Sequence, residues 1–238
     1  MSLCSAPTIR TRIKLCGMTR EQDVDASVEA GVDAVGFVLY AASPRAVSAA
    51  RAGELARRLP PFVAPVLLFV NPSAAEVEAA CALVPNATVQ FHGDENAQAC
   101  QDLAGRRPYL RAARIPLGSG ATSFDLVKYS DIHFQAQAIL LDAHVDGFGG
   151  GGKVFNWSLL PPSVNAHLVL SGGLTAANVA DGIAQLRPRG KSLSVDVSSG
   201  IEADGPGGTT LKGIKDAQKI NQFVAAVRAA DEHLAGLS

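Results

Sequence analysis

Asp196-Val197-Ser198-Ser199-Gly200-Ile201-Glu202 is the stretch that decides the fold. It follows residues 191–195, which are typical of a short strand, and it breaks into small residues where the backbone must turn. The strand before it, residues 168–170, ends in the same way at Ser171-Gly172-Gly173-Leu174-Thr175. Glycine lets backbone N–H groups approach an anion, and a following helix N-terminus adds partial positive charge. Adjacent strands with such ends predict a phosphate site, whose candidate residues are Gly172, Gly173, Ser198, Ser199 and Gly200.

The rest of the chain alternates short apolar runs with segments of helical periodicity. The apolar runs occupy residues 12–16, 35–39, 63–70, 88–91, 108–115, 138–141, 168–170 and 191–195. Continuous apolar strands imply a parallel sheet whose outer face is covered, and right-handed crossovers then close it. We therefore predict an α/β fold, a single (β/α)8 TIM barrel with the phosphate site at its last two strands. A doubly wound open sheet is the alternative, and it fits less well because no G-x-G-x-x-G follows the first strand.

Length and composition limit the classes of protein that this chain can be. A chain of 238 residues with 47% hydrophobic residues suits one barrel or two smaller domains. We assign residues 12–238 to the barrel and residues 1–11 to a flexible N-terminal tail. The net charge is −1 and no basic patch is visible, which argues against a nucleic-acid partner.

The cysteines and the apolar segments predict the compartment. The four cysteines show no C-x-x-C spacing, so neither a zinc site nor a disulfide framework is expected, and a reducing, cytoplasmic location is the simpler interpretation. Residues 1–11 contain no apolar core of a signal peptide. No apolar run is long enough to span a bilayer, so no membrane partner is expected.

Helix starts are predicted at polar capping residues. Thr19 with Gln22, and Ser73 with Glu76, match the capping-box pattern. Further helices are expected to start at Ser48, Asp94, Asn156, Thr175 and, for the last one, about Ile214. Residues 121–130 predict only a weak helix.

Two strand-end residues are candidates for acid–base chemistry. Cys16 precedes a predicted helix N-terminus, which stabilises a thiolate, so it is a candidate base. The alternative is a small buried hydrophobe. Asp142 ends an apolar strand and is a candidate general acid, although such an aspartate equally serves as a helix cap or a loop ion pair.

Other polar residues at the same strand ends have weaker assignments. Arg45 could clamp a carboxylate, or it could be a solvated surface arginine. His92 could transfer protons or bind substrate, although a histidine before glycine is often structural. Asp196 could orient a substrate hydroxyl or amine, or accept a backbone N–H at the turn. Residues 149–152 are four glycines that form either a linker or a lid over the site.

Several motifs in order give the chain a family resemblance. They are Lys14-Leu15-Cys16-Gly17-Met18-Thr19, Gly36-Phe37-Val38, Ser43-Pro44-Arg45, Val89-Gln90-Phe91-His92-Gly93-Asp94-Glu95, Leu140-Leu141-Asp142, residues 150–153 with Phe155-Asn156-Trp157, Ser171-Gly172-Gly173-Leu174 and the stretch that begins at Asp196. From Lys14 to about Phe223 the chain resembles the phosphoribosylanthranilate isomerases of tryptophan biosynthesis. No single motif is specific, but their order and placement are.

The resemblance implies a reaction and roles for the candidate residues. These barrel enzymes convert N-(5-phosphoribosyl)anthranilate to 1-(2-carboxyphenylamino)-1-deoxyribulose 5-phosphate by an Amadori rearrangement, with no metal or cofactor. The family pattern makes Cys16 the general base and Asp142 the general acid. It has Arg45 hold the anthranilate carboxylate, while the two glycine loops hold the phosphate. The family contains monomers and homodimers, and the expected partner is a small phosphoribosyl substrate.

The chain departs from the family pattern at three places, and other functions stay open. Phe91 replaces a usual leucine, Asn156 replaces a usual aspartate, and residues 203–212 look like an insertion before the last helix. A first alternative is another phosphosugar barrel enzyme such as indole-glycerol-phosphate synthase, which resembles this family at the phosphate site. That family relies on a lysine acid and glutamate partners, and the strand-end residues named above include neither. A second alternative is a barrel that binds a phosphoribosyl ligand without catalysis, and an NAD-binding fold fits least well.

Overall fold

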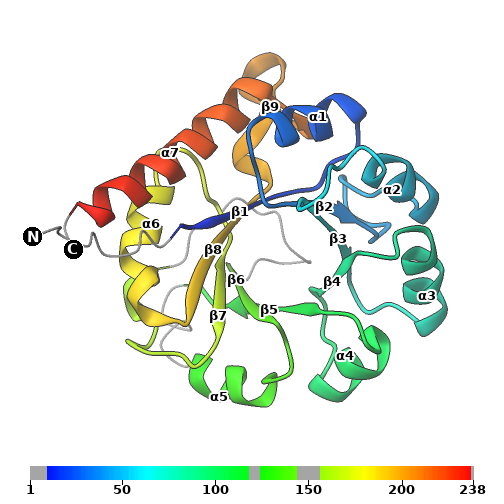
Figure 1. Ribbon diagram of the computed structural model, residues 1–238, viewed down its shortest axis with the longest axis horizontal. Coiled ribbons are helices and arrows are strands. Elements are labelled where there is room, and N and C mark those ends of the chain that lie inside the picture. The colour runs from blue at the N-terminus through cyan, green and yellow to red at the C-terminus, as the bar shows by residue number, and fades with distance from the viewer. Residues whose placement is uncertain (1–9, 118–123, 144–155, 237–238) are drawn as a thin grey trace, which may run out of the picture.

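The computed structural model describes residues 10–117, 124–143 and 156–236. Strands and helices alternate along these residues, as Figure 1 shows. The strands of the barrel are β1 (Arg12–Cys16), β2 (Ala34–Val38), β3 (Ala64–Phe69), β4 (Thr88–Phe91), β5 (Tyr109–Ile115), β6 (Ala138–Ala143), β7 (His167–Leu170) and β8 (Ser192–Val197). The α-helices are α1 (Glu21–Glu29), α2 (Ala49–Ala56), α3 (Ala74–Leu83), α4 (Ala97–Ala104), α5 (Leu126–Ile132), α6 (Val179–Leu186) and α7 (Ala217–Ala235).

Strands β1 to β8 form a closed barrel in chain order, which confirms the predicted (β/α)8 fold. Every neighbouring pair is parallel, and β1 closes the ring against β8 with Ile13 opposite Val195. The helices surround this ring on its outside (Figure 1). Because all strands run the same way, their C-terminal ends meet at one opening, which we call the C-terminal mouth.

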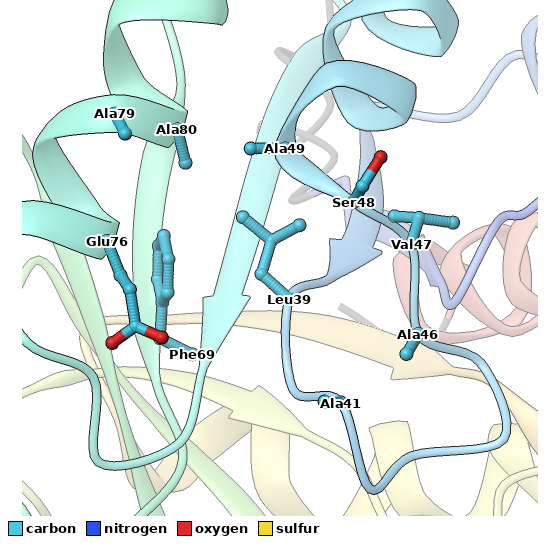
Figure 2. Close-up of a pocket in the computed structure, with 10 residues that line it drawn as sticks. All are labelled: Leu39, Ala41, Ala46, Val47, Ser48, Ala49, Phe69, Glu76, Ala79 and Ala80. Atoms are coloured by element: carbon cyan, nitrogen blue, oxygen red, sulfur yellow. The ribbon is translucent and has the colours of Figure 1, made fainter.

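Two of the predicted caps at helix starts are confirmed near a surface groove. The Ser48 hydroxyl accepts the N–H of Arg51 at the start of α2. Ser73 and Glu76 form the predicted capping box at the start of α3. A groove of about 490 Å³ lies between these two helices. Figure 2 shows the side chains that line it, most of which are apolar. None of the candidate catalytic or binding residues lines it.

Other helix starts differ from the prediction, and at Thr19 a distant partner takes the capping side chain. The Thr19 hydroxyl donates to the carbonyl of Gly213 instead of capping α1, and Arg20 occupies the N-cap position. Helix α4 is capped by Asn96 rather than Asp94, whose N–H donates to Asn71. Helix α6 starts at Val179, later than Thr175.

Shorter or uncertain segments have mixed outcomes. Asn156 caps a short 3₁₀ helix, η2 (Trp157–Leu159), as predicted. Helix α5 begins after Asp125, whose side chain accepts the N–H of Lys128, so it lies further along the chain than the predicted 121–130. The glycines at 149–152 lie outside the described residues.

The insertion at 203–212 belongs to an ordered hairpin. Strand β9 (Glu202–Asp204) pairs antiparallel with β10 (Thr210–Lys215), with Thr210 opposite Asp204. Helix α7 therefore starts later than about Ile214, at Ala217, and the Asp216 carboxylate accepts the N–H of Lys219 as its cap. The hairpin returns Lys215 to the C-terminal mouth beside Ser198, where Nζ donates to the Ser198 carbonyl oxygen at 2.9 Å.

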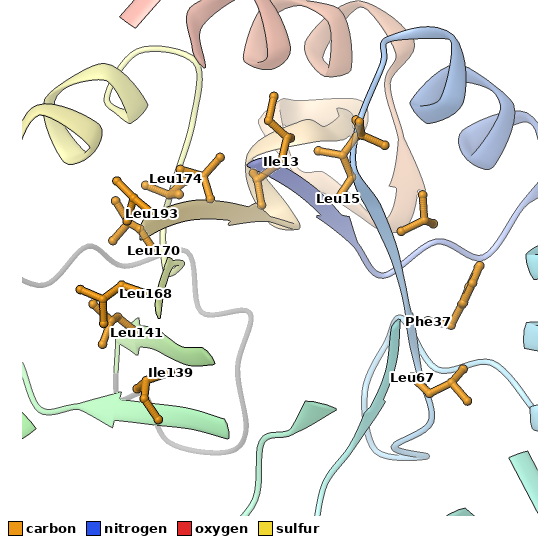
Figure 3. Packing of buried hydrophobic residues seen from close by; sticks show 14 of the residues in the cluster. Ile13, Leu15, Phe37, Leu67, Ile139, Leu141, Leu168, Leu170, Leu174 and Leu193 are labelled. Carbon is orange, nitrogen blue, oxygen red and sulfur yellow. The ribbon is translucent and has the colours of Figure 1, made fainter. Parts of the chain in front are cut away.

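Strand alternation separates two apolar layers. Successive side chains on a strand point to opposite faces. Outward residues such as Leu15, Phe37 and Leu141 are fully buried against the helices, as Figure 3 shows. Inward residues such as Val66 and Leu140 form a second cluster that fills the barrel. Polar residues that share the inward parity are therefore directed into the barrel interior or its mouth.

The first and last elements are tied together. Thr11 is buried, and its N–H and hydroxyl both donate to the carboxylate of Asp231 on α7. Arg187 also donates to Asp231, while Arg10 pairs with Asp33 at 2.7 Å. Thr11 and Arg10 thus belong to the folded unit, although the sequence alone assigns them to the tail.

Candidate active site

The inward parity of β1, β4, β6 and β8 brings most candidate residues to the C-terminal mouth. Cys16 ends β1, His92 follows β4, Asp142 lies near the end of β6, and Asp196 lies near the end of β8. All four are buried, with exposed fractions of 4–6%. A polar group is buried at a cost unless it has partners, so the partners of each residue define its role.

Asp142 is held by His92. The Nε2 atom of His92 lies 3.0 Å from Oδ2 of Asp142, and Nε2 of Gln90 lies 3.2 Å from Nδ1 of His92. A Gln90 amide nitrogen can only donate, so in this arrangement Nδ1 accepts and the ring proton lies on Nε2, facing the carboxylate. This tautomer follows from the amide orientation rather than from a visible hydrogen. Gln90 and His92 thus orient the candidate acid.

Cys16 lies beside a buried ion pair. Nζ of Lys14 donates to Oδ1 of Asp196 at 2.9 Å, and the strand register places these two residues opposite each other. Lys14 also adjoins the Cys16 thiol, because a Cβ at Gly36 would lie 2.7 Å from Sγ of Cys16 and 3.1 Å from Nζ of Lys14. Asp196 is therefore already paired with a cation, and the cation adjoins the candidate base.

The pKa of Cys16 is raised, which corrects the expectation of a helix-stabilised thiolate. Burial is the main cause, and Asp196 adds to it, while Lys14 and Lys215 act in the opposite direction. Helix α1 begins only at Glu21, five positions after Cys16, and the partial charge of a helix end acts only near its first turn. The positive charge near Cys16 thus comes from lysines and not from a helix end.

Arg45 is buried against Glu202 instead of facing solvent. Its Nε donates to Oε1 at 2.7 Å and its Nη2 to Oε2 at 2.8 Å. No hydrogen bond from Nη1 to another described residue is found. A side chain at position 17 would meet Cδ of Arg45 at 2.7 Å and Oγ of Ser198 at 3.1 Å, and Gly17 also has a φ of +80°. Glycine is required there, because the turn after β1 packs against both residues.

Lys215 connects the Arg45 pair to the β8 loop. Its Nζ donates to Oε1 of Glu202 and Oγ of Ser198, each at 3.3 Å, in addition to the Ser198 carbonyl. Burial lowers the pKa of Lys215 to about 8, although the charge of Glu202 opposes this. Glu202 is shared by two cations, and it also accepts the N–H of Gly213 at 2.8 Å.

The two glycine loops come together as the sequence predicts. A Cβ at Gly200 would lie 1.9 Å from the carbonyl oxygen of Leu174, so the loops after β7 and β8 are in backbone contact. Gly172 and Gly173 adopt φ values of +80° and +64°, which only glycine adopts readily. A Cβ at Gly172 would lie 2.7 Å from Oδ1 of Asp142, so this loop adjoins the candidate acid.

Sequence reasoning missed four polar residues of the site, Lys14, Gln90, Glu202 and Lys215. Lys14 and Gln90 stand two positions before Cys16 and His92 on the same strand face, and this parity could have identified them. The lysines and Glu202 also remove the ground on which indole-glycerol-phosphate synthase was disfavoured, namely the absence of lysine and glutamate from the mouth.

Comparison with known proteins decides between these families. The family model described as N-(5'phosphoribosyl)anthranilate (PRA) isomerase matches residues 13–226. An N-(5'-phosphoribosyl)anthranilate isomerase from Methylibium petroleiphilum is 59% identical over 95% of this chain and 98% of its own length. The chain belongs to the phosphoribosylanthranilate isomerase family. Within this family, the motifs at Cys16, His92 and Asp142 stand at the strand ends where the resemblance leads us to expect them.

Solved structures of the isomerase family share the barrel. The phosphoribosylanthranilate isomerase from Thermotoga maritima is 36% identical with a TM-score of 0.77, covering 92% of this chain and 99% of its own. Two further structures of phosphoribosylanthranilate isomerases are each 32% identical, with a TM-score of 0.71 and the same coverage. One is a complex with reduced 1-(o-carboxyphenylamino)-1-deoxyribulose 5-phosphate. The other shows monomers generated from the dimeric enzyme of Thermotoga maritima.

Proposed function

We propose that this chain isomerises N-(5'-phosphoribosyl)anthranilate to 1-(2-carboxyphenylamino)-1-deoxyribulose 5-phosphate. The observation that carries the proposal is the convergence of Cys16, Asp142 and two contacting glycine loops at one barrel mouth, in a chain 59% identical to an isomerase of this name. The reaction moves protons within one molecule, so one acid and one base satisfy its chemistry.

In the proposed mechanism, Asp142 starts the reaction and Cys16 completes it. Protonated Asp142 gives its proton to the ribose ring oxygen, and the C1–O bond breaks to leave a Schiff base between C1 and the anthranilate nitrogen. The Cys16 thiolate then removes the proton from C2, and the electron pair moves toward the nitrogen to give an enolamine. The enolamine becomes the ketone when C1 takes the proton from the Cys16 thiol and the C2 hydroxyl gives its proton to the Asp142 carboxylate, which restores both residues.

The remaining candidate residues position the substrate. We assign the phosphate to Gly172, Gly173, Ser198, Ser199 and Gly200, whose two loops are in backbone contact and adjoin Lys215 at Ser198. Arg45 would hold the anthranilate carboxylate through Nη1, since its other nitrogens bind Glu202. Asp196 would accept a hydrogen bond from a substrate hydroxyl. His92 would influence the substrate indirectly, by orienting Asp142.

The location and assembly state complete the proposal. Cys16, Cys81 and Cys100 are free thiols, which suits the cytoplasm as a reducing compartment. Within the described part of the chain, no helix is long and apolar enough to cross a membrane. The active form is proposed to be a monomer or a homodimer, which sedimentation equilibrium distinguishes.

Turnover of phosphoribosylanthranilate tests the function. The substrate is generated in situ and its fluorescence is followed for the wild type, Cys16→Ser and Asp142→Asn. Turnover by the wild type, with losses of about 10²–10⁴-fold in each variant, supports the assignment. Cys81→Ser and Asp131→Asn are matched controls away from the mouth, and they should retain turnover. A folded wild type that binds the product but does not turn over would favour the non-catalytic alternative.

A further inference from the structure

Lys14 is a buried cation that the mechanism above does not use. It lies two positions before Cys16 on β1, so both side chains point into the barrel. Only 5% of Lys14 is exposed. A lysine is almost never buried to this extent unless it is paired, so its surroundings require an explanation.

Gly36 on β2 lets the thiol and the ammonium approach the same point. Cys16 and Gly36 are opposite each other in the strand register. A Cβ at Gly36 would lie 2.7 Å from Sγ of Cys16 and 3.1 Å from Nζ of Lys14. Both groups therefore occupy the space that any other residue at position 36 would fill.

The charges of three groups act on Cys16 from the elements around it. Lys14 comes from the same strand, Asp196 from β8, and Lys215 from β10, while β2 presents the uncharged Gly36. Burial disfavours the thiolate, and Asp196 repels it, whereas both lysines attract it. Among the charges that act on Cys16, Lys14 has the largest effect. The pKa of Lys14 itself is raised, because Asp196 and Cys16 together outweigh its burial, so it stays an ammonium group.

We propose that Lys14 is a positioning residue that provides the positive charge on which the Cys16 thiolate depends. The inference rests on the proposed function, in which Cys16 is the base. Lys14 keeps its proton throughout. When the thiolate takes the C2 proton, a neutral thiol forms and the ammonium returns to its pairing with Asp196 alone. Asp196 competes with the thiolate for Lys14, and it thereby limits how acidic the thiol becomes.

The test measures the thiol directly and does not require turnover. The rate at which iodoacetamide alkylates Cys16 is followed from pH 6 to pH 10 by mass spectrometry of the Cys16 peptide, which separates it from the other cysteines. In Lys14→Met, Cys16 should be alkylated at least about tenfold more slowly than in the wild type at pH 7. The midpoint of the pH profile of the alkylation rate should shift up by about one pH unit or more. Lys14→Arg should restore most of the rate because it keeps the charge. Lys128→Met, which removes an exposed lysine from α5, should match the wild type.

Asp196→Asn supplies an opposite expectation that does not depend on the folding of Lys14→Met. Without the Asp196 carboxylate, no other anion competes with the thiolate for the Lys14 ammonium group. Alkylation of Cys16 at pH 7 should therefore be faster than in the wild type. A folded Lys14→Met with the wild-type profile would overturn the proposal. So would an Asp196→Asn profile that is unchanged or shifted to higher pH. If the wild type shows no turnover but the pH profile of Cys16 alkylation still differs between the wild type and Lys14→Met, the isomerase function is contradicted. The role of Lys14 in stabilising the thiolate then remains supported.

Discussion

Arg45 and Glu202 form a bidentate ion pair between the loop after β2 and strand β9, 157 positions apart in the chain. The exposed fractions of the two side chains are 7% and 0%. Glu202 is also 3.3 Å from Nζ of Lys215, so one carboxylate compensates two buried cations. Stability and the proposed binding of the substrate carboxylate by Arg45 therefore depend on the same carboxylate.

Glu202→Gln should destabilise the fold strongly. The amide cannot neutralise Arg45 and Lys215, and breaking a buried pair costs about 3–5 kcal/mol of unfolding free energy. Urea denaturation measures the loss. Glu54→Gln is the control, since Glu54 pairs with Arg51 at the surface and its replacement should cost no more than about 1 kcal/mol. Equal losses in the two variants would contradict the role of Glu202.

The same carboxylate predicts a pH dependence of stability. Burial alone would raise the pKa of Glu202, but Arg45, Lys215 and the Gly213 N–H together lower it below its ordinary value of 4.5. A carboxylate whose pKa is lowered on folding stabilises the protein above its unfolded pKa, and this stabilisation is lost as the pH falls through the folded pKa. Glu202→Gln should therefore show a flatter loss of stability below pH 4.5. A slope equal to that of the wild type would count against this.

Gly172→Ala should reduce both stability and turnover. The substitution places Cβ 2.7 Å from Oδ1 of Asp142 and forces alanine to a φ of +80°. The left-handed backbone alone costs about 1–2 kcal/mol. Gly31→Ala isolates that cost, because Gly31 has a φ of +77° with nothing within 4 Å of its Cβ position. Steady-state kinetics should show normal kcat/KM for Gly31→Ala and a loss for Gly172→Ala.

Gln90→Met should lower kcat with little change in KM. The variant keeps the volume of the side chain but removes the donor to Nδ1 of His92, which leaves the ring and Asp142 free to turn. A displaced catalytic group costs about 10²-fold in rate. Gln98→Met is the matched control, since the amide of Gln98 binds only Asp102 among its described side-chain partners and is exposed. A rise in KM at constant kcat would instead place Gln90 in substrate binding.

His133 should make the protein less stable in mild acid. It is buried beside Tyr129, with ring centroids 4.6 Å apart, and burial lowers its pKa to about 4. The unfolded chain takes up this proton at higher pH than the folded one, so stability falls as pH decreases from about 6.5 toward 4. His133→Phe keeps the ring contact and should reduce this loss. Thermal unfolding at pH 7.5 and 5 measures it, and parallel changes in both proteins would refute it.

The barrel was predictable because its signals are local and repeated. Each apolar run carries its own strand, and polar caps such as Ser48 and Ser73 bind the N–H groups of their own helix. The prediction of Thr19 as a helix cap was wrong, because its hydroxyl donates a hydrogen bond to the carbonyl of Gly213, 194 positions away. The predicted start of α7 was also too early, because the residues up to Lys215 form β10, which pairs with β9 before the helix begins.

The strand ends of the site were predictable, but the partners of its residues were not. Fold class and motif order place Cys16, His92 and Asp142 at one mouth. They do not show that Arg45 is paired with Glu202, because that contact depends on how a loop folds back onto a hairpin. The inward direction of Lys14 followed from its parity with Cys16, but its pairing with Asp196 did not, because that contact depends on the register of β1 against β8.

The bonds between Thr11 and Asp231 have a consequence for the timing of synthesis on the ribosome. The ring can close only after both strands of the β1–β8 seam have left the exit tunnel, and the Thr11–Asp231 contact can form only after α7 has followed. The edge of β1 that pairs with β8 has no partner until β8 has left the tunnel. Lys14 therefore lacks its partner Asp196 during most of translation. The surroundings of Cys16 are completed only in one late step, when β8 pairs with β1.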